Sequence, residues 1–386
     1  MKIGFDVSQT GKSKAGCGYF ADSLLQHLAA LDRQNEYILY PTFGDFFFDP
    51  DWSAITDQRR QANFRRGKAP RTLEAARVFW NNPAADFEKQ LGYPEVIHAN
   101  NFYCPVGLKQ ARLVYTLYDL SFISHPEWTT EANRVGCFNG VFNASLHADR
   151  IVAISEFSRR HFLATFPHYP PERITVIHLA SRFTKGLQLA KPPSMTALQP
   201  DQFWLSVGTL EPRKNQQRLL QAYARLRKEG TTCFPLVLAG GAGWMMDDFT
   251  KQAELLGVQR DVTLTGYVDD DALQWLYQNC FAFVYPSLFE GFGLPVLEAM
   301  SQGAAAITSD CTSLTEITGD AGLLVDPLSE ESICQAMRRL SQDHALRSSL
   351  QTKAKQQASG FSWTNAAREM LKVYAEVMIE DKYHRS

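Results

Sequence analysis

The stretch Tyr285–Gly303, which reads Y-P-S-L-F-E-G-F-G-L-P-V-L-E-A-M-S-Q-G, decides the expected fold. It leaves an apolar strand over Ala282–Tyr285, crosses a loop with two glycines and enters a helix at Pro295. Proline suits the start of a helix because its missing N–H would be unpaired there anyway. Gly303 stands where a helix end favours a left-handed residue. The stretch therefore predicts a strand–loop–helix unit of a parallel α/β sheet.

Two glutamates give this stretch its candidate chemistry. Glu290 lies in the expected loop, and Glu298 lies about one turn into the expected helix. Between them, Gly291 and Gly293 allow the backbone to approach a ligand closely, and the helix N-terminus favours an anion. Glu298 alone is a weak signal, because a glutamate near a helix start often only complements the helix dipole. Together, carboxylates for hydroxyl groups and amides for phosphate predict a sugar-nucleotide site.

Composition places the chain among ordinary globular proteins. With 386 residues, 45% of them hydrophobic and 21% charged, it is expected to form two domains. A net charge of −2 gives no case for nucleic-acid binding. The seven cysteines lack a C-x-x-C pair, which predicts neither a disulfide framework nor a zinc site but a reducing cytoplasm. The chain opens on a strand pattern and has no apolar run near the roughly 20 residues of a membrane span, so a soluble protein is expected.

Strand and helix patterns alternate along both halves of the chain. This alternation predicts an α/β protein of two Rossmann-like, doubly wound parallel-sheet domains that face each other across a cleft. The expected domains are 1–183 and 201–363. The stretch 184–200 lacks periodicity and contains prolines, so it is interpreted as the interdomain linker.

The first strand is followed by the glycine pair Gly16-x-Gly18. The pair matches half of a dinucleotide fingerprint but lacks the third glycine. A tight turn and a ligand loop are therefore equal alternatives, and the place of the pair after a first strand only tilts the choice towards a ligand.

A basic, aromatic segment interrupts the first half. Its positive residues between 59 and 71 are Arg59, Arg60, Arg65, Arg66, Lys68 and Arg71. Peripheral contact with an anionic membrane, or with a phosphate-bearing acceptor, is one hypothesis. A solvated insertion is favoured, because runs of charge are usually solvated. A helix is expected to follow over Leu73–Leu91.

The second half opens with the cluster V-G-T-L-E-P-R-K-N over 207–215, directly after an expected strand. Arg213 and Lys214 then lie at the carboxyl edge of a parallel sheet, where such sheets bind ligands. Two cations there can stabilise a diphosphate leaving group without a metal ion. The alternative is that one cation only pairs with Glu211 or another carboxylate. Asn215 is expected to cap the next helix.

Aspartates at two element boundaries have two readings each. The triplet Asp269–Asp271 can hold a divalent metal, but it directly precedes a helical pattern, so helix capping is favoured. Tyr118 and Asp119 end an expected strand, where Asp119 can contact sugar hydroxyls or handle a proton. Capping of the next loop by Asp119 is equally compatible with the sequence.

These motifs resemble the retaining family 4 glycosyltransferases, which have the glycosyltransferase B fold. The hallmark Glu-x7-Glu pair is met by Glu290 and Glu298. Further matches are V-G-T-L-E-P-R-K-N (207–215), L-T-G-Y-V (264–268), Y-P-S (285–287), A-G-L-L-V-D-P (321–327), F-S-W (361–363) and, more loosely, A-G-C-G-Y (15–19), Y-D-L-S-F (118–122), P-E-W (126–128) and V-A-I-S-E-F-S (152–158).

The resemblance implies a nucleotide-sugar donor, a glycan or lipid-linked acceptor, no cofactor and no metal. It also implies that the helix within 364–386 crosses back to the first domain. The implied donor-binding residues are Arg213 and Lys214 for the diphosphate, Glu298 for the ribose, Tyr267 and Val268 for the base, Gly16 and Gly18 near the phosphates, and Glu290 with the Gly291, Phe292, Gly293 and Leu294 backbone for the transferred sugar. The 207–215 motif is similar to that of a mannosyltransferase-like subgroup.

One position departs from the family pattern. Family members commonly have His-Asp where this chain has Tyr118-Asp119, and tyrosine offers no imidazole chemistry at neutral pH. We expect a retaining hexosyltransferase, for mannose or another hexose, with Glu290, Asp119 and Tyr118 near the reacting sugar. The alternatives are an altered or inactive sugar-nucleotide-binding protein and a nucleotide-sugar epimerase on the same fold.

Overall fold

The computed structural model describes residues 1–383 except 12–13, 15, 45–46, 49–62, 69, 71, 184–185, 188, 231–233 and 242–248. The chain forms two compact units, Met1–Leu179 with Ser362–Ser386, and Ala180–Phe361. The stretch 184–200, which the sequence suggested as a linker, thus falls within the second unit. Its short 3-10 helix Pro193–Met195 buries the side chain of Met195.

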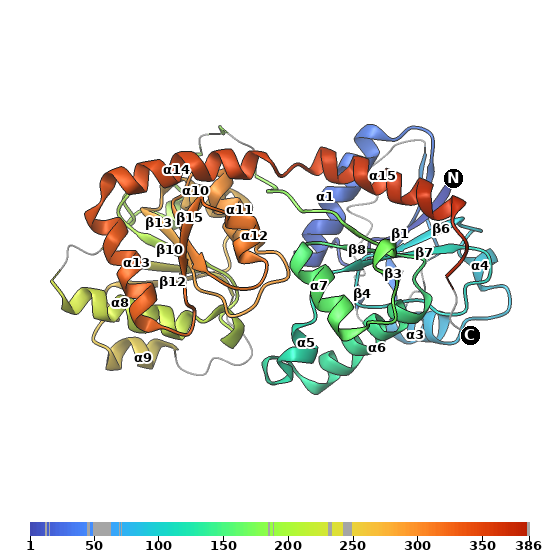
Figure 1. Ribbon diagram of the computed structural model, residues 1–386, viewed down its shortest axis with the longest axis horizontal. Helices are drawn as coiled ribbons and strands as arrows, with labels where there is room; N and C mark the ends of the chain where they lie inside the picture. Colours follow the sequence, from blue (N-terminus) through green and yellow to red (C-terminus); the bar gives the residue numbers. More distant parts are fainter. Residues whose placement is uncertain are drawn as a thin grey trace. The chain divides into compact units, whose positions relative to one another are not determined.

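A parallel sheet with strand order β5-β2-β1-β6-β7-β8-β9 forms the centre of the first unit (Figure 1). Its strands are β1 Lys2–Asp6, β2 Glu36–Tyr40, β5 Phe64–Arg66, β6 Val96–Ala99, β7 Arg112–Leu117, β8 Arg150–Ala153 and β9 Ile174–Val176, beside an antiparallel pair β3 Thr42–Phe43 and β4 Phe47–Phe48. The helices are α1 Gly16–Leu31, α3 Leu73–Asn81, α4 Phe87–Gln90, α5 Ser121–Ser124, α6 Glu131–His147, α7 Glu156–Thr165 and α15 Trp363–Ile379.

Helix α15 belongs to the first unit and packs along α1 (Figure 1). Its Tyr374 is fully buried and its hydroxyl lies 2.6 Å from Nδ1 of His98, in the central strand β6. The other ring nitrogen of His98 lies 2.8 Å from Oγ1 of Thr116 in β7. Burial lowers the pKa of His98 to about 3, so the ring is neutral and ties the helix to the sheet through hydrogen bonds.

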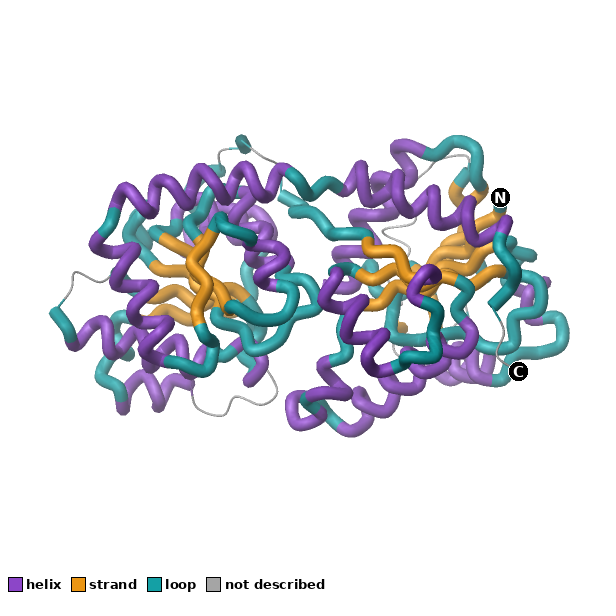
Figure 2. Tube along the Cα trace, in the orientation of Figure 1, coloured by secondary structure: helices purple, strands orange, loops and turns teal. Residues whose placement is uncertain are grey.

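The second unit has a parallel sheet with strand order β12-β11-β10-β13-β14-β15, surrounded by helices (Figure 2). Its strands are β10 Trp204–Val207, β11 Leu236–Ala239, β12 Val262–Gly266, β13 Ala282–Tyr285, β14 Ala306–Ser309 and β15 Gly322–Val325. The helices are α8 Gln216–Lys228, α9 Phe249–Leu255, α10 Asp270–Asn279, α11 Leu294–Ser301, α12 Leu314–Thr318, α13 Glu330–Gln342 and α14 His344–Ser359.

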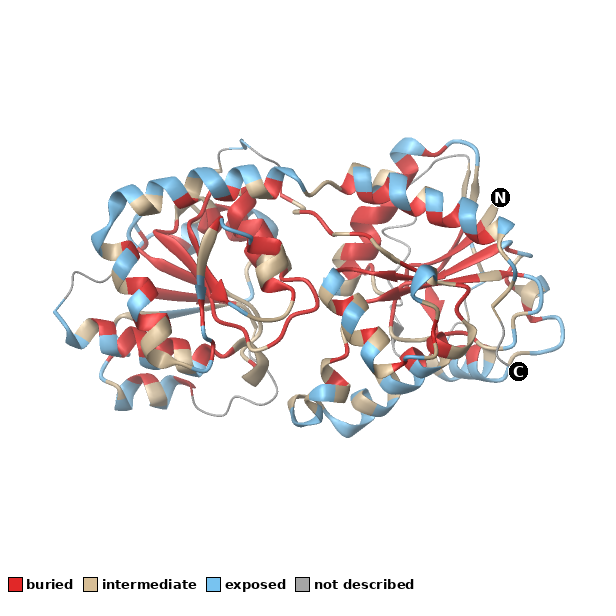
Figure 3. Cartoon of the chain, viewed as in Figure 1, coloured by how far each residue is buried: buried red, intermediate tan, exposed pale blue. Residues whose placement is uncertain are grey.

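Strand order explains where the loops of the second unit converge. The central strands are apolar and buried, as sheets covered on both faces require (Figure 3). Strand β10 pairs with β11 on one side and with β13 on the other, all in parallel. The direction of winding reverses at β10, so the loops after β10 and β13 leave the same edge side by side. These loops carry 208–215 and 286–293.

One expectation for the first unit was wrong, and one strand was not predicted. The helix expected over Leu73–Leu91 is two helices, α3 and α4, because Pro83 between them disfavours helical backbone at the preceding residue. Within the basic segment, Phe64–Arg66 forms the edge strand β5, where Arg65 pairs with Glu36 of β2. Charged side chains are typical of such an edge. Arg59, Arg60 and Arg71 lie outside the described residues.

Within the described part of the chain, no helix has the length and hydropathy to cross a membrane. The cysteines described there are all free.

The two glycines at the start of α1 predict a matched pair of variants. A Cβ at Gly18 would lie 2.1 Å from the carbonyl oxygen of Gln9, whereas a Cβ at Gly16 meets nothing within 4 Å. We expect Gly18→Ala to lower the free energy of unfolding by about 2 kcal/mol or more, because backbone must move, and Gly16→Ala to change it by less than about 0.5 kcal/mol. Urea unfolding followed by circular dichroism measures both, and equal effects would contradict this packing.

Candidate functional site in the second unit

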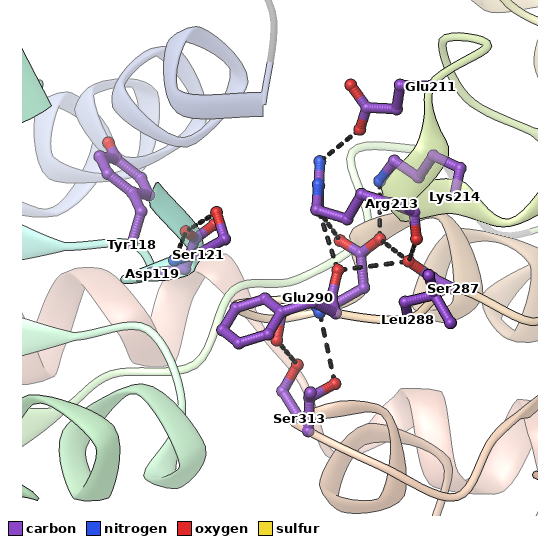
Figure 4. Close-up of polar contacts among 12 residues, drawn as sticks. Tyr118, Asp119, Ser121, Glu211, Arg213, Lys214, Ser287, Leu288, Glu290 and Ser313 are labelled. Carbon is purple, nitrogen blue, oxygen red and sulfur yellow. Dashed lines mark hydrogen bonds and ion pairs between the residues drawn. The ribbon is translucent and has the colours of Figure 1, made fainter. Parts of the chain in front are cut away.

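A buried carboxylate, Glu290, forms the centre of the candidate site (Figure 4). Lys214 Nζ donates to its Oε1 at 2.7 Å, and Arg213 Nη1 donates to its Oε2 at 3.1 Å. Oε1 also accepts hydrogen bonds from the hydroxyls of Tyr285 at 2.9 Å and Ser287 at 2.7 Å. The predicted cation pair and the first predicted glutamate therefore form one cluster.

The charges in this cluster balance one another. Burial alone would raise the pKa of Glu290, but the charges of Lys214 and Arg213 lower it to about 2, so the group is a carboxylate. Burial and the charge of Arg213 lower the pKa of Lys214, while Glu290 opposes that change. Arg213 also pairs with Glu211 at 2.7 Å. The pairing that the sequence left open as an alternative is thus observed, because both cations have carboxylate partners.

Backbone and side-chain contacts connect the two loops that hold the cluster. The carbonyl oxygen of Arg213 accepts hydrogen bonds from Leu288 N at 2.8 Å and from Ser287 Oγ at 3.0 Å (Figure 4). Asn215 Nδ2 donates to the carbonyl oxygens of Pro286 and Pro327 at 2.8 and 2.7 Å. The loops after β10 and β13 are therefore fastened to each other below the charged groups.

The sequence predicted that the Asn215 side chain caps α8, and this prediction was wrong. Asn215 occupies the N-cap position of α8, but its backbone is left-handed, with φ of 60°, and its side chain makes no capping hydrogen bond. The amide instead joins the loops described above. Asparagine tolerates this left-handed conformation better than most residues do.

The predicted glycine loop leads directly into α11. Gly293, the N-cap residue, has φ of 100°, and a Cβ there would lie 2.7 Å from Leu314 Cδ2. Phe292 is buried and lies edge-on to Phe361. The carbonyl oxygen of Glu290 accepts a hydrogen bond from Ser313 Oγ at 2.8 Å (Figure 4). Gly291 is buried in the same loop, and Leu294 is the first residue of the helix.

The second predicted glutamate, Glu298, lies on α11 with 2% exposure. Arg182 Nη1 lies 3.0 Å from its Oε1, and the hydroxyl of Tyr277 donates to its Oε2 at 3.3 Å. Burial raises the pKa of Glu298 to about 7, although Arg182 opposes this. Glu298 thus titrates near neutral pH, whereas Glu290 does not.

The other predicted residues of this unit lie at boundaries of elements. Tyr267 and Val268 directly follow β12, and the Tyr267 side chain is 76% exposed. Asp269 caps α10 by accepting a hydrogen bond from Ala272 N at 2.8 Å, as favoured from the sequence. No group of three His, Cys, Asp or Glu side chains that could hold a metal ion occurs among the described residues.

In the first unit, Tyr118 and Asp119 follow β7. The Tyr118 hydroxyl donates to the carbonyl oxygen of Asn100 at 2.7 Å, and the Tyr118 carbonyl accepts from Ser158 Oγ at 2.7 Å. Asp119 Oδ1 accepts hydrogen bonds from both the backbone N and the Oγ of Ser121, which is the loop-capping alternative (Figure 4). Gly16 and Gly18 lie in the first turn of α1.

Four residues whose side chains contact the carboxylates of Glu290 and Glu298 were not predicted: Tyr285, Ser287, Arg182 and Tyr277. The motif Y-P-S contained Tyr285 and Ser287, but its letters do not show that both hydroxyls reach Glu290. Arg182 and Tyr277 had no signal at all, because their contacts with Glu298 span 116 and 21 positions of the chain.

Comparison with known proteins identifies the family. Residues 15–180 match the family described as "Glycosyltransferase Family 4", and residues 193–357 match "Glycosyl transferases group 1". The chain is 33% identical to the O-antigen chain mannosyltransferase B of Escherichia coli, over 97% of this chain and 99% of that protein. The chain belongs to glycosyltransferase family 4. It is therefore a retaining glycosyltransferase, as the motifs predicted.

Other relatives of this glycosyltransferase match in part or in fold. The serotype-specific mannosyltransferase WbdA of Escherichia coli is 38% identical over 46% of this chain and 22% of its own length. Anabaena HepE, solved in complex with UDP and glucose, has a TM-score of 0.71 at 20% identity, covering 97% of this chain and all of the other. WaaG, a glycosyltransferase involved in lipopolysaccharide biosynthesis, has a TM-score of 0.70 at 16% identity, covering 98% of this chain and all of WaaG. These likenesses show the glycosyltransferase B fold.

The depressed pKa of Glu290 predicts a pH-dependent contribution to stability. Because the folded-state pKa is about 2 and the usual value is 4.5, the carboxylate stabilises the fold above pH 4.5 and loses this effect as pH falls towards 2. The free-energy gap between wild type and Glu290→Gln should therefore be largest near pH 7, at roughly 3 kcal/mol, and shrink as the pH falls below about 4.5.

Urea unfolding at pH 7, 5, 4 and 3.5 measures this gap. Glu254→Gln, at an exposed position of α9, is the matched control and should show a small gap at every pH. A gap for Glu290→Gln that stays constant with pH would contradict the charge assignment.

Proposed function

We propose that this glycosyltransferase transfers mannose from a nucleotide-diphosphate donor to a hydroxyl group of a growing polysaccharide or lipid-linked glycan. The observation that carries the proposal is the end-to-end similarity to O-antigen chain mannosyltransferase B. The partial match to WbdA, a second mannosyltransferase, points the same way. HepE binds UDP and glucose, which supports a nucleotide-sugar donor for this architecture but does not select the base.

In this proposal, Arg213 and Lys214 bind the donor diphosphate. Both cations are part-buried and their carboxylate partners lie in the same loops, so an incoming diphosphate meets fixed positive charge in a poorly solvated place. As the glycosidic bond breaks, negative charge grows on the leaving diphosphate, and these cations stabilise it. The two cations take the role that a metal ion has elsewhere, so we propose metal-independent transfer.

The remaining donor contacts follow from the loop and from α11. Glu298 accepts hydrogen bonds from the ribose hydroxyls, and the backbone after β12, at Tyr267 and Val268, lies against the base. Glu290, with the backbone of 291–294, contacts the transferred sugar. Since Glu290 is a carboxylate whose Oε1 already accepts three hydrogen bonds, it acts mainly by fixing Lys214 and by offering Oε2 to a sugar hydroxyl.

For the first unit, we propose that the end of β7 contributes to the acceptor side of the reaction. Asp119 is half-buried and keeps a second carboxylate oxygen beside the one that accepts from Ser121. Tyr118 packs at this strand end and transfers no proton. Burial raises its pKa well above the usual value, and its hydroxyl already donates to the carbonyl oxygen of Asn100. Gly16 and Gly18 begin α1, whose N-terminus favours a phosphate.

For the basic segment 59–71 we propose a solvated surface, with peripheral membrane contact as the alternative. Lys68 Nζ donates to Gln90 Oε1 at 2.5 Å, and Arg65 pairs with Glu36. These partners favour the solvated alternative for the described members of that segment.

Donor turnover tests the proposed function. A panel of GDP-mannose, UDP-glucose, UDP-galactose and UDP-N-acetylglucosamine is screened by thermal shift, because a specific donor must raise apparent stability. Release of the nucleoside diphosphate from the best donor is then measured with EDTA present. Lys214→Ala and Glu290→Ala should each lower this turnover by about 100-fold or more while circular dichroism stays native.

Lys353→Ala is the matched control, since Lys353 is an exposed lysine of the same unit that pairs with Asp320. It should keep the wild-type rate. Wild-type rates in both Lys214→Ala and Glu290→Ala would contradict the proposed donor site. Donor binding by the wild type without turnover on any acceptor would instead favour an inactive sugar-nucleotide-binding protein.

A further inference from the structure

Arg182 bridges two carboxylates of the second unit. Its Nη1 lies 3.0 Å from Glu298 Oε1, and its Nη2 lies 3.3 Å from Asp270 Oδ1. The guanidinium carbon lies 4.6 Å from the centre of the Phe183 ring. The Arg182 side chain is only 15% exposed. The Phe183 ring and the two carboxylates together fix its position, although Glu298 lies far from it in the sequence.

Glu298 needs such a partner. It is buried on α11, and a buried charge without compensation is costly enough to be neutralised. The titratable groups that face it are Arg182, the Tyr277 phenol on its other oxygen, and Asp270 at the start of α10. Burial and Asp270 raise the pKa of Glu298, and Arg182 lowers it. Arg182 is therefore the positive group that keeps the ionised form accessible near neutral pH.

We propose that Arg182 is a positioning residue for donor binding, whose guanidinium fixes the orientation and the negative charge of Glu298 so that this carboxylate accepts hydrogen bonds from vicinal hydroxyls of the donor's ribose. The inference rests on the proposed role of Glu298. A protonated carboxyl has one acceptor oxygen fewer for a pair of neighbouring hydroxyls, so affinity for the donor depends on this charge.

The electrostatic arrangement predicts opposite effects for two neighbouring variants. Donor affinity should rise with pH as Glu298 ionises. Arg182→Gln removes the charge that opposes protonation of Glu298, so this rise should occur at higher pH than in the wild type. Asp270→Asn removes a charge that favours protonation, so the same strengthening should occur at lower pH. A purely structural role of Arg182 weakens binding without moving this pH dependence in either direction.

The experiment measures the dissociation constant of the best donor of the panel above, by isothermal titration calorimetry between pH 5.5 and 8.5. Wild-type affinity should rise as pH increases through about 7, where Glu298 ionises. For Arg182→Gln we expect about tenfold weaker binding at pH 7 and a midpoint about one pH unit higher. Arg182→Lys should retain part of the wild-type affinity, and Asp270→Asn should lower the midpoint.

Glu298→Gln distinguishes a wrong role for Glu298 from a wrong role for Arg182. If this variant binds the donor as the wild type does, or if no donor of the panel binds, the proposed role of Glu298 fails and the inference fails with it. If Glu298→Gln binds weakly but Arg182→Gln keeps the wild-type midpoint, the inference about Arg182 alone is overturned. Weak, pH-independent binding by Glu298→Gln together with the opposite shifts in the other two variants supports it.

Discussion

A carboxylate that is almost fully removed from water requires fixed positive charge, and the second unit is built around that requirement. Glu290 has 6% exposure and takes Lys214 and Arg213 as partners. Breaking such a pair by removing one partner leaves an uncompensated buried charge, which is far more costly than losing an exposed ion pair. The loops after β10 and β13 therefore have to stay together, and they are joined further by Asn215 and by the hydrogen bonds to the carbonyl oxygen of Arg213.

The sheet topology provides the place for this cluster. Because the winding direction changes between β10 and β13, two loops leave adjacent strand ends without a helix between them. The N-terminus of α11 follows the second loop and adds backbone N–H groups that favour an anion. Two cations, a buried carboxylate and a helix N-terminus thus come from one edge of one sheet, and the proposed donor site rests on this arrangement.

The sequence predicted what depends on local patterns. Strands such as Leu236–Ala239 and Ala282–Tyr285 were placed with their observed bounds, because short apolar runs between turn residues have few alternatives. The sequence pattern did not predict the break between α3 and α4, although Pro83 marks its place. The sequence did not predict the edge strand β5, because Arg65 and Arg66 do not form the apolar run that indicates a buried strand.

At the candidate site, motif spacing predicted that Glu290, Arg213 and Lys214 belong together. It did not predict that they contact one another directly, nor that Asn215 joins loops instead of capping α8. Arg182 could not be found from the sequence, because its contact with Glu298 depends on how distant segments pack. Such motifs predict contacts between residues that are close in sequence, whereas an ion pair between distant residues can be identified only from the folded structure.

A comparison of nucleotides tests most directly whether Arg213 and Lys214 bind the diphosphate of the donor. Isothermal titration calorimetry compares a nucleoside diphosphate with its monophosphate, for both guanosine and uridine, on the wild type and on Lys214→Ala. We expect the wild type to bind the diphosphate of the preferred base at least about tenfold more tightly than the monophosphate, because charge-assisted hydrogen bonds to the second phosphate add affinity. Lys214→Ala should lose most of this preference. Equal affinities for the two nucleotides in the wild type, or a preference that Lys214→Ala leaves unchanged, would contradict diphosphate binding by these cations.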